Sequence, residues 1–179
     1  MGLQFSITAI GSIMLQSAVN TLGAVYVSSF AAAAKVKQLA MCPYDGFATA
    51  SATFGSQNLG AGKIERIKKG VHASAFLAFF TSAFISIMMF LFGKTLLSMF
   101  ISGDPEQTSQ VLAIAWHYLS IMASCLCILY FLYVYRSALQ GLGNTMIPML
   151  SGVMEFFVRV GVALLLPKFI GQNGIFYAE

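Results

Sequence analysis

Long stretches without charged residues alternate along the chain with short stretches that hold several. No Asp, Glu, Lys or Arg occurs in residues 1–34, 70–93 or 107–135, and two weaker runs of this kind cover 46–62 and 137–154. A helix needs about 20 predominantly apolar residues to cross a bilayer. The charge pattern therefore predicts several segments that cross a membrane.

The predicted fold class is an all-α, polytopic membrane bundle. Backbone N–H and C=O groups have no water to bond inside a bilayer, so each crossing segment satisfies them within a helix. A transmembrane barrel would show short alternating strands between turns, and the chain lacks that pattern. Five spanning helices are predicted at about residues 3–22, 30–60, 71–93, 105–139 and 146–166.

Glycine and proline mark the predicted breaks between and within these helices. We expect the first turn to occupy residues 23–29, Pro43 to kink the second helix, and Pro167 to close the fifth. A further apolar segment begins at about residue 174. We therefore expect a further span to start there and the chain to be a fragment of a longer protein.

Composition supports a membrane protein. Of the 179 residues, 58% are hydrophobic and 9% are charged, and the mean hydropathy is +0.80. Soluble domains carry about 25% charged residues, so this chain has too few to cover a globular surface. The net charge of +4 is small and lies in the predicted loops, which suits a membrane surface and not nucleic acid.

A basic stretch covers residues 57–70, from the end of the second predicted helix to the start of the third. It contains Lys63, Arg66, Lys68 and Lys69 against a single acid. Short loops rich in Lys and Arg lie on the cytoplasmic side of membrane proteins. We expect a cytoplasmic hairpin loop here, in a multi-pass protein of the inner (plasma) membrane; the alternative is a solvated loop without topological meaning.

Polar residues recur every fourth position in the first predicted helix: Gln4, Thr8, Ser12, Gln16 and Asn20. Four residues correspond to about 400°, so this set forms one slowly drifting stripe on the helix. A polar stripe on a spanning helix has to face protein or water. It forms either a seam of hydrogen bonds between helices or the wall of a transport cavity, and the two interpretations are compatible.

Among the charged residues within the predicted spans, three are candidates for function. Asp45 lies two residues after the predicted kink, and an intramembrane carboxylate marks a candidate functional site. The alternative for Asp45 is an acid near the outer interface, paired with Lys37 or another base. Glu155 and Arg159 lie four residues apart near mid-membrane, a spacing that favours an ion pair on one helix face.

No arrangement of residues typical of an enzyme occurs in the sequence. There is no phosphate-binding loop, no nucleotide fingerprint and no His and Cys spacing that would bind a metal. Cys42, Cys125 and Cys127 lie in apolar runs and are interpreted as packing residues. We therefore expect a protein that is not an enzyme and binds no metal or cofactor.

Four stretches carry a family resemblance: Met1-Gly2-Leu3-Gln4 to Asn20, Lys37-Gln38-Leu39 with Pro43, Gln57-Asn58-Leu59-Gly60-Ala61-Gly62-Lys63 with Arg66, and Ala138-Leu139-Gln140-Gly141-Leu142-Gly143-Asn144-Thr145 followed by Pro148, Glu155 and Arg159. In order and spacing, these stretches resemble the multidrug and toxic compound extrusion (MATE) transporters. The first looks like the family's seventh helix, the second like the eighth, and the last like the end of the tenth and the eleventh.

The resemblance implies two six-helix lobes with a cavity between them, of which this chain is most of the C-terminal lobe. It also implies export of small organic cations, driven by Na⁺ or H⁺ entry, by a protein that works with its N-terminal lobe in a lipid bilayer. Gln4, Thr8, Gln16, Asn20 and Asp45 are then candidates for the substrate or cation pathway. No acid occurs in residues 107–135 or in the first helix, where some members carry one, so both coupling ions stay open.

Two other functions stay open. A lipid-linked oligosaccharide flippase of the same superfamily needs several bases for a pyrophosphate, and Arg136 and Arg159 are the only candidates for this role within the spans. A non-transporting membrane fragment would use the polar stripe only for helix packing.

Overall fold

The computed structural model describes residues 2–102, 104–170 and 172–178. These residues form five α-helices and one 3-10 helix, and the described residues contain no strand, which confirms the all-α class. The elements are α1 (Gly2–Asn20), α2 (Ala24–Gly60), α3 (Ile64–Ser98), α4 (Pro105–Gly141), α5 (Met146–Ile170) and η1 (Gln172–Ala178).

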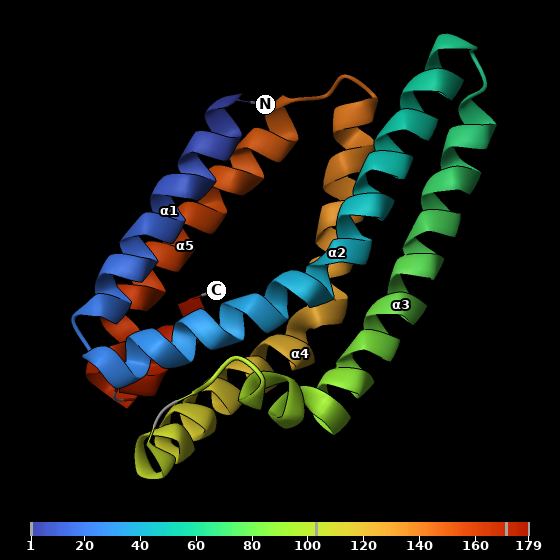
Figure 1. Ribbon diagram of the computed structural model, residues 1–179. Helices are drawn as coiled ribbons and strands as arrows, with labels where there is room; N and C mark the ends of the chain where they lie inside the picture. The colour runs from blue at the N-terminus through green and yellow to red at the C-terminus, as the bar shows by residue number, and fades with distance from the viewer. Residues whose placement is uncertain (1, 103, 171, 179) are drawn as a thin grey trace.

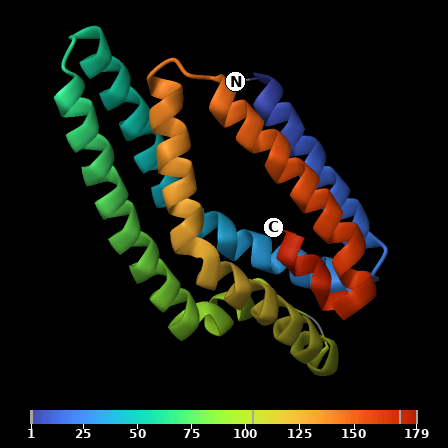
Figure 2. The same cartoon turned by 180° about the vertical axis from the view of Figure 1, so that it is seen from behind.

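The helices form two groups, which Figure 1 and the reverse view in Figure 2 both show. In one group α1 and α5 lie side by side, and we call them the α1–α5 pair. In the other group α2, α3 and α4 pack against one another, and we call them the three-helix bundle. Contacts between the two groups are far less extensive than contacts within them.

Three described helices are long and apolar enough to cross a membrane: α3, α4 and Met146–Pro167 of α5. The spans predicted in α1 and α2 stay predictions. The face of α3 that turns away from the bundle is apolar and exposed, as lipid contact requires, and it carries Phe76, Phe80, Phe84, Ile87 and Leu91.

Two connections are closed by the same backbone motif. After α2, the Lys63 N–H donates to the Asn58 carbonyl at 2.8 Å, and Gly62 has a φ of 69°. After α4, the Asn144 N–H donates to the Leu139 carbonyl at 3.0 Å, and Gly143 has a φ of 82°. Glycine adopts this left-handed conformation readily, so each helix can end and reverse within three or four residues.

Several predicted boundaries are wrong. The turn expected at residues 23–29 is shorter, because Gly23 reverses the chain at a φ of 100° and α2 begins at Ala24. Pro167 does not close α5, which continues to Ile170. The basic stretch is mostly helical, with Arg66 in the first turn of α3.

The basic stretch and Lys94 lie near opposite ends of α3, about 45 Å apart along a helix of this length. At the C-terminal end, Ile175 and Phe176 of η1 are buried against the bundle, and the Phe176 ring lies 5.3 Å from the Tyr118 ring. The further span expected from residue 174 stays a prediction.

The kink expected at Pro43 is visible as a change of direction along α2, and α4 bends beside it (Figure 1). Pro43 has no N–H to donate, and its ring opens the preceding turn of the helix. At this opened turn the Ala40 carbonyl accepts a hydrogen bond of 2.7 Å from the fully buried Tyr130 hydroxyl on α4. A side chain of α4 thus satisfies the backbone of α2 at its bend.

We expect Tyr130→Phe to lower the free energy of unfolding by about 0.6–1.7 kcal/mol, the range for hydrogen bonds between membrane helices. Denaturant titration of the purified chain in detergent micelles measures this change. Tyr135→Phe is the matched control, because the Tyr135 side chain is 45% exposed. Equal effects of the two variants would contradict a role for Tyr130 at the bend.

Candidate functional site

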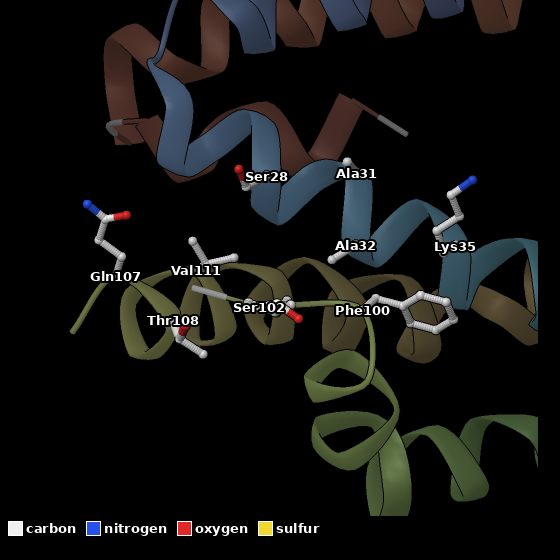
Figure 3. A pocket seen from close by; sticks show the side chains of 10 residues that line it. Ser28, Ala31, Ala32, Lys35, Phe100, Ser102, Gln107, Thr108 and Val111 are labelled. Carbon is white, nitrogen blue, oxygen red and sulfur yellow. The ribbon is translucent and has the colours of Figure 1, made fainter. Parts of the chain in front are cut away.

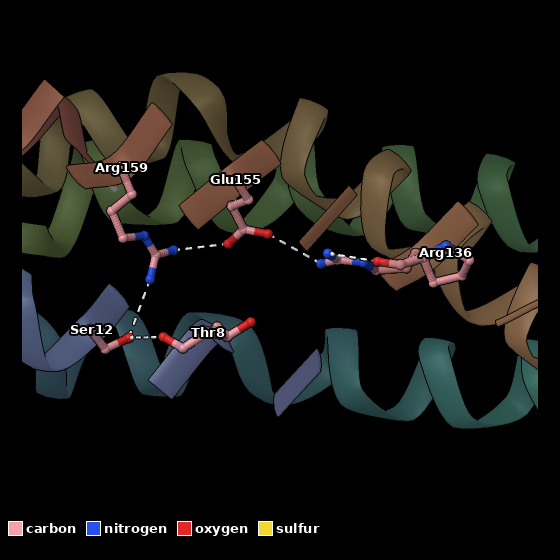
Figure 4. A network of polar contacts seen from close by, with 6 residues as sticks. Thr8, Ser12, Arg136, Glu155 and Arg159 are labelled. Atoms are coloured by element: carbon pink, nitrogen blue, oxygen red, sulfur yellow. Dashed lines mark hydrogen bonds and ion pairs between the residues drawn. The ribbon is translucent and has the colours of Figure 1, made fainter. Parts of the chain in front are cut away.

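Three charged side chains meet between the α1–α5 pair and the three-helix bundle (Figure 4). Arg159 Nη2 donates to Glu155 Oε1 at 2.9 Å, and Arg136 Nη1 donates to Glu155 Oε2 at 3.2 Å. Arg159 Nη1 also donates to the Ser12 hydroxyl on α1 at 3.2 Å. The four residues, which we call the ion network, connect α1, α4 and α5.

The three charged side chains of the ion network are largely buried. The side chains of Arg136 and Arg159 are 7% and 10% exposed, and that of Glu155 is 23% exposed. A buried carboxylate is stabilised when both oxygens accept hydrogen bonds from opposite charges, as Glu155 does here. Since contacts between α4 and α5 are otherwise sparse, the Arg136–Glu155 ion pair is a main link between the two groups of helices.

Small residues on α1 make room for this arrangement. A side chain at Gly11 would meet the Phe156 ring at 3.2 Å and Arg159 Cδ at 3.6 Å, so glycine allows α5 to approach closely. One position further along, the Ser12 hydroxyl accepts from Arg159 and donates to the Thr8 carbonyl at 3.1 Å. The α1 helix therefore meets the ion network at a glycine and a hydroxyl.

The polar stripe predicted on α1 divides into two parts. Thr8 and Ser12 lie beside α5, whereas the Gln16 amide donates to the Asn20 side-chain oxygen at 3.0 Å and Asn20 is exposed. Each step of four residues rotates about 40° around the helix, so the stripe drifts away from α5. The side chain of Gln4, also predicted as a site residue, lies outside the described residues.

A cavity of about 460 Å³ lies beside the ion network, between α1, α2 and α4, and we call it the α1–α2–α4 cavity. Its charged walls are Asp45 from α2 and Arg136 from α4. Its polar lining is completed by Thr8, Tyr44, Thr49, Thr53, Tyr133, Ser137 and Gln140. Cavities of this size can accept drug-sized molecules.

Asp45 is an exposed side chain on the wall of this cavity. Among the described residues no ion pair involves Asp45, so the predicted alternative of a pair with Lys37 is not what the structure shows. Eight residues separate the two side chains, about 12 Å along a helix, and Pro43 bends α2 between them. The carboxylate is therefore available to groups that enter the cavity.

Sequence reasoning missed the role of Arg136. The sequence suggested Arg136 only as one of two bases within the spans that a flippase could use, yet it pairs with Glu155 and lines the α1–α2–α4 cavity. Its guanidinium carbon also lies 5.7 Å from the centre of the Tyr133 ring. Glu155 and Arg136 lie 19 residues apart in the sequence, on two different helices. The periodicity of a single helix does not predict such a contact.

A second cavity, of about 370 Å³, lies towards the opposite end of the three-helix bundle (Figure 3). Lys35 of α2, Phe100 and Ser102 of the α3–α4 connection, and Thr108 of α4 line it. It has no carboxylate in its lining, so it does not attract a cation as the α1–α2–α4 cavity does. No cluster of three His, Cys, Asp or Glu that could hold a metal occurs among the described residues.

Comparison with known proteins decides the family, because the MatE family model matches residues 1–165. The chain belongs to the MatE family. It is 25% identical over 175 residues to a probable multidrug resistance protein, YpnP, of Bacillus subtilis, covering 97% of this chain and 38% of that protein. The predicted resemblance is confirmed, and members of this family are multi-pass membrane transporters and not enzymes.

Solved MatE structures share the fold. An outward-facing MATE multidrug resistance transporter superposes with a TM-score of 0.90 at 17% identity, covering 99% of this chain and 39% of that one. A transporter of the MOP superfamily from Pyrococcus furiosus, described as having a binding pocket of reverse polarity, superposes with a TM-score of 0.88 at 18% identity. The match covers 98% of this chain and 39% of that one. The chain thus spans about two fifths of the MatE proteins it matches.

We expect Glu155→Gln to lower the free energy of unfolding by about 3–5 kcal/mol, because it leaves two buried guanidinium groups without a counter-charge. Denaturant titration in detergent micelles measures the loss. Glu65→Gln is the control, since its 2.9 Å pair with Lys68 is exposed and contributes at most about 1 kcal/mol. A loss no larger than that of the control would contradict the structural role of Glu155.

Proposed function

We propose that this chain is the C-terminal lobe of an exporter of small organic cations, driven by the entry of Na⁺ or H⁺ across the plasma membrane. Membership of the MatE family supports efflux transport, and coverage of about two fifths of its relatives suits one of two lobes. The observation that carries the proposal is the α1–α2–α4 cavity, where the Asp45 carboxylate faces a space large enough for a drug.

Asp45 has the role of attracting and holding the cationic group of the substrate. Among the described residues that line the cavity it is the one carboxylate, and the Tyr44 and Tyr133 rings, 4.6 Å apart, line the same cavity. Aromatic faces add attraction for organic cations. The ion network links α4 to α5 beside this cavity, and Thr8 of α1 completes the cavity wall.

Coupling to an ion gradient follows from the direction of transport. Moving one positive charge outward against an inside-negative potential of 100 mV requires about 2.3 kcal/mol. The entry of Na⁺ or H⁺ supplies this free energy. In inverted vesicles, imposing each gradient separately tests the coupling, and drug movement that responds to neither would contradict it.

The flippase alternative receives less support from the same geometry. Both arginines within the spans, Arg136 and Arg159, are paired with Glu155 and are therefore partly neutralised. A lipid pyrophosphate carries several negative charges and would need further bases. The α1–α2–α4 cavity adds none, because Arg136 is the one base among its lining residues.

We expect the full-length transporter that contains this lobe to lower ethidium retention in an efflux-deficient bacterial host. Asp45→Asn should reduce the initial efflux rate about tenfold, the equivalent of losing one charge-assisted hydrogen bond. Glu65→Gln, at the exposed start of α3, serves as the control and should export normally.

The 179 residues expressed alone should not transport, because alternating access requires two lobes that move against each other. Membrane insertion of every variant is verified by fractionation. Unchanged retention of ethidium and of other cationic dyes, with the full-length protein inserted, would contradict the proposed function.

A further inference from the structure

The second cavity, at the α3–α4 connection, has a polar lining with a single positive charge. Lys35 of α2 is the one charged residue among the described residues that line it. Asp104 and Glu106, exposed at the start of α4, are not among these residues. The hydroxyl and amide groups of the lining come from Ser28, Ser102, Gln107 and Thr108. A lysine together with several hydrogen-bond donors suits an anionic group such as a phosphate.

Lys35 stands at the open edge of this cavity. Its side chain is exposed, and its ammonium group points outward from α2 (Figure 3). Among the described residues Lys35 forms no ion pair. A lysine has a flexible four-carbon stem, so the ammonium group can turn towards a ligand at the cavity edge. Its charge is therefore available to an anion that binds there.

An apolar groove lies next to the second cavity, between α2 and α3, and we call it the α2–α3 groove. Its volume is about 310 Å³, and all the described residues that line it are apolar, among them Val36, Leu39, Ala40, Phe84, Met88 and Leu96. Lys35 precedes Leu39 by one helical turn, and Leu96 precedes Phe100 of the cavity by four residues. The polar cavity and the apolar groove are therefore neighbours along both segments.

The cavity and the groove lie where the headgroup and the chains of a lipid would be. The charge-free run 70–93 ends at Lys94, whose Nζ lies 5.4 Å from the centre of the Trp116 ring. Tryptophan and outward-reaching lysine are typical of the membrane–water interface. From Leu96 back to Phe84 the groove follows α3 for about 18 Å. The hydrocarbon of one leaflet is about 15 Å deep, so the groove spans roughly its depth.

The α2–α3 groove is open to the side. Phe84 and Phe92 on one wall are 61% and 53% exposed, and Leu39 on the other is 57% exposed. Phe84 also belongs to the exposed apolar face of α3, which is long and apolar enough to cross a membrane. A lipid in the bilayer can therefore reach the groove directly from this face.

We propose that the second cavity and the α2–α3 groove together bind one anionic phospholipid, with its phosphate at Lys35 and an acyl chain along Leu39, Phe84 and Leu96. The lipid belongs to the leaflet at the Lys94 end of α3, away from the basic stretch. This site shares no lining residue with the α1–α2–α4 cavity and is additional to the proposed function.

The bound lipid would support the bend of α2. Ala40 lines the α2–α3 groove, and its carbonyl accepts the hydrogen bond from Tyr130 at the turn that Pro43 opens. An acyl chain in the groove packs against the same turn. The lipid and Tyr130 therefore both contact the bend of α2.

Native mass spectrometry of the full-length transporter that contains this lobe counts the lipids it binds. The protein is stripped of lipid in a neutral detergent and titrated with palmitoyl-oleoyl phosphatidylglycerol, or with the phosphatidylcholine that has the same chains and no net charge. We expect a site that binds phosphatidylglycerol about fivefold more tightly, the effect of one lysine on an anionic headgroup.

Charge variants locate the headgroup. Lys35→Gln should lose this preference, so that at a lipid concentration that fills the site the protein retains one phosphatidylglycerol fewer. Lys35→Arg keeps the charge and should retain the full number. Lys94→Gln is the matched control, because it removes a positive charge at the same end of α3 but outside the cavity lining. It should also retain the full number.

A second pair of variants locates the acyl chain. Leu39→Trp fills the α2–α3 groove and should weaken the binding of both lipids at this site several-fold. Phe76→Trp is its control, because Phe76 is 64% exposed on α3 and lies outside the groove. Glycerol 3-phosphate, which has the phosphate without the chains, should not displace the lipid.

An unchanged number of phosphatidylglycerol molecules in Lys35→Gln would overturn the inference. So would equal losses in Lys35→Gln and Lys94→Gln, which would indicate a general attraction to charge at the interface. Displacement by glycerol 3-phosphate would indicate a site for free phosphate instead. Unaltered lipid binding by Leu39→Trp would mean that something other than an acyl chain, such as the other lobe or a second copy, covers the groove. These measurements need no transported drug, so they are independent of the proposed function.

Discussion

A guanidinium group buried among membrane helices needs an acceptor with negative charge, and in this lobe Glu155 provides it for two arginines at once. The ion network is therefore the constraint on which the arrangement of the helices depends. Arg159 holds α5 against α1 through Ser12, and Arg136 holds α5 near α4. Elsewhere the α1–α5 pair and the three-helix bundle have few contacts, so this shared carboxylate positions one group against the other.

The rest of the fold gives this network its surroundings. Glycine turns after α2 and α4 bring both helices to the same end of the lobe, and Pro43 bends α2 where Tyr130 satisfies the opened backbone. The bends carry Asp45 and Arg136 to facing walls of one cavity. Charge exposed to lipid is costly, and the structure places Arg136, Glu155 and Arg159 between helices, where they pair with one another.

The features that the sequence predicted are those that depend on local spacing. Charge-free runs located the helices, and the four-residue interval between Glu155 and Arg159 matches a contact on a single helix face. The missed features depend on distant segments or on single backbone angles. Arg136 reaches Glu155 from another helix, and the turn before α2 is short because Gly23 alone reverses the chain. The prediction that α5 ends at Pro167 is wrong, because proline disfavours a helix interior without excluding it and α5 continues to Ile170.

A double-mutant cycle between Arg136 and Glu155 tests the central claim most directly. The free energy of unfolding in detergent micelles is measured for Arg136→Met, Glu155→Met, the double variant and the unaltered protein, and the interaction energy is the departure from additivity. Close, buried charge pairs give about 1.5 kcal/mol or more. The account predicts a coupling in that range, and additive effects, with a coupling near zero, would contradict it.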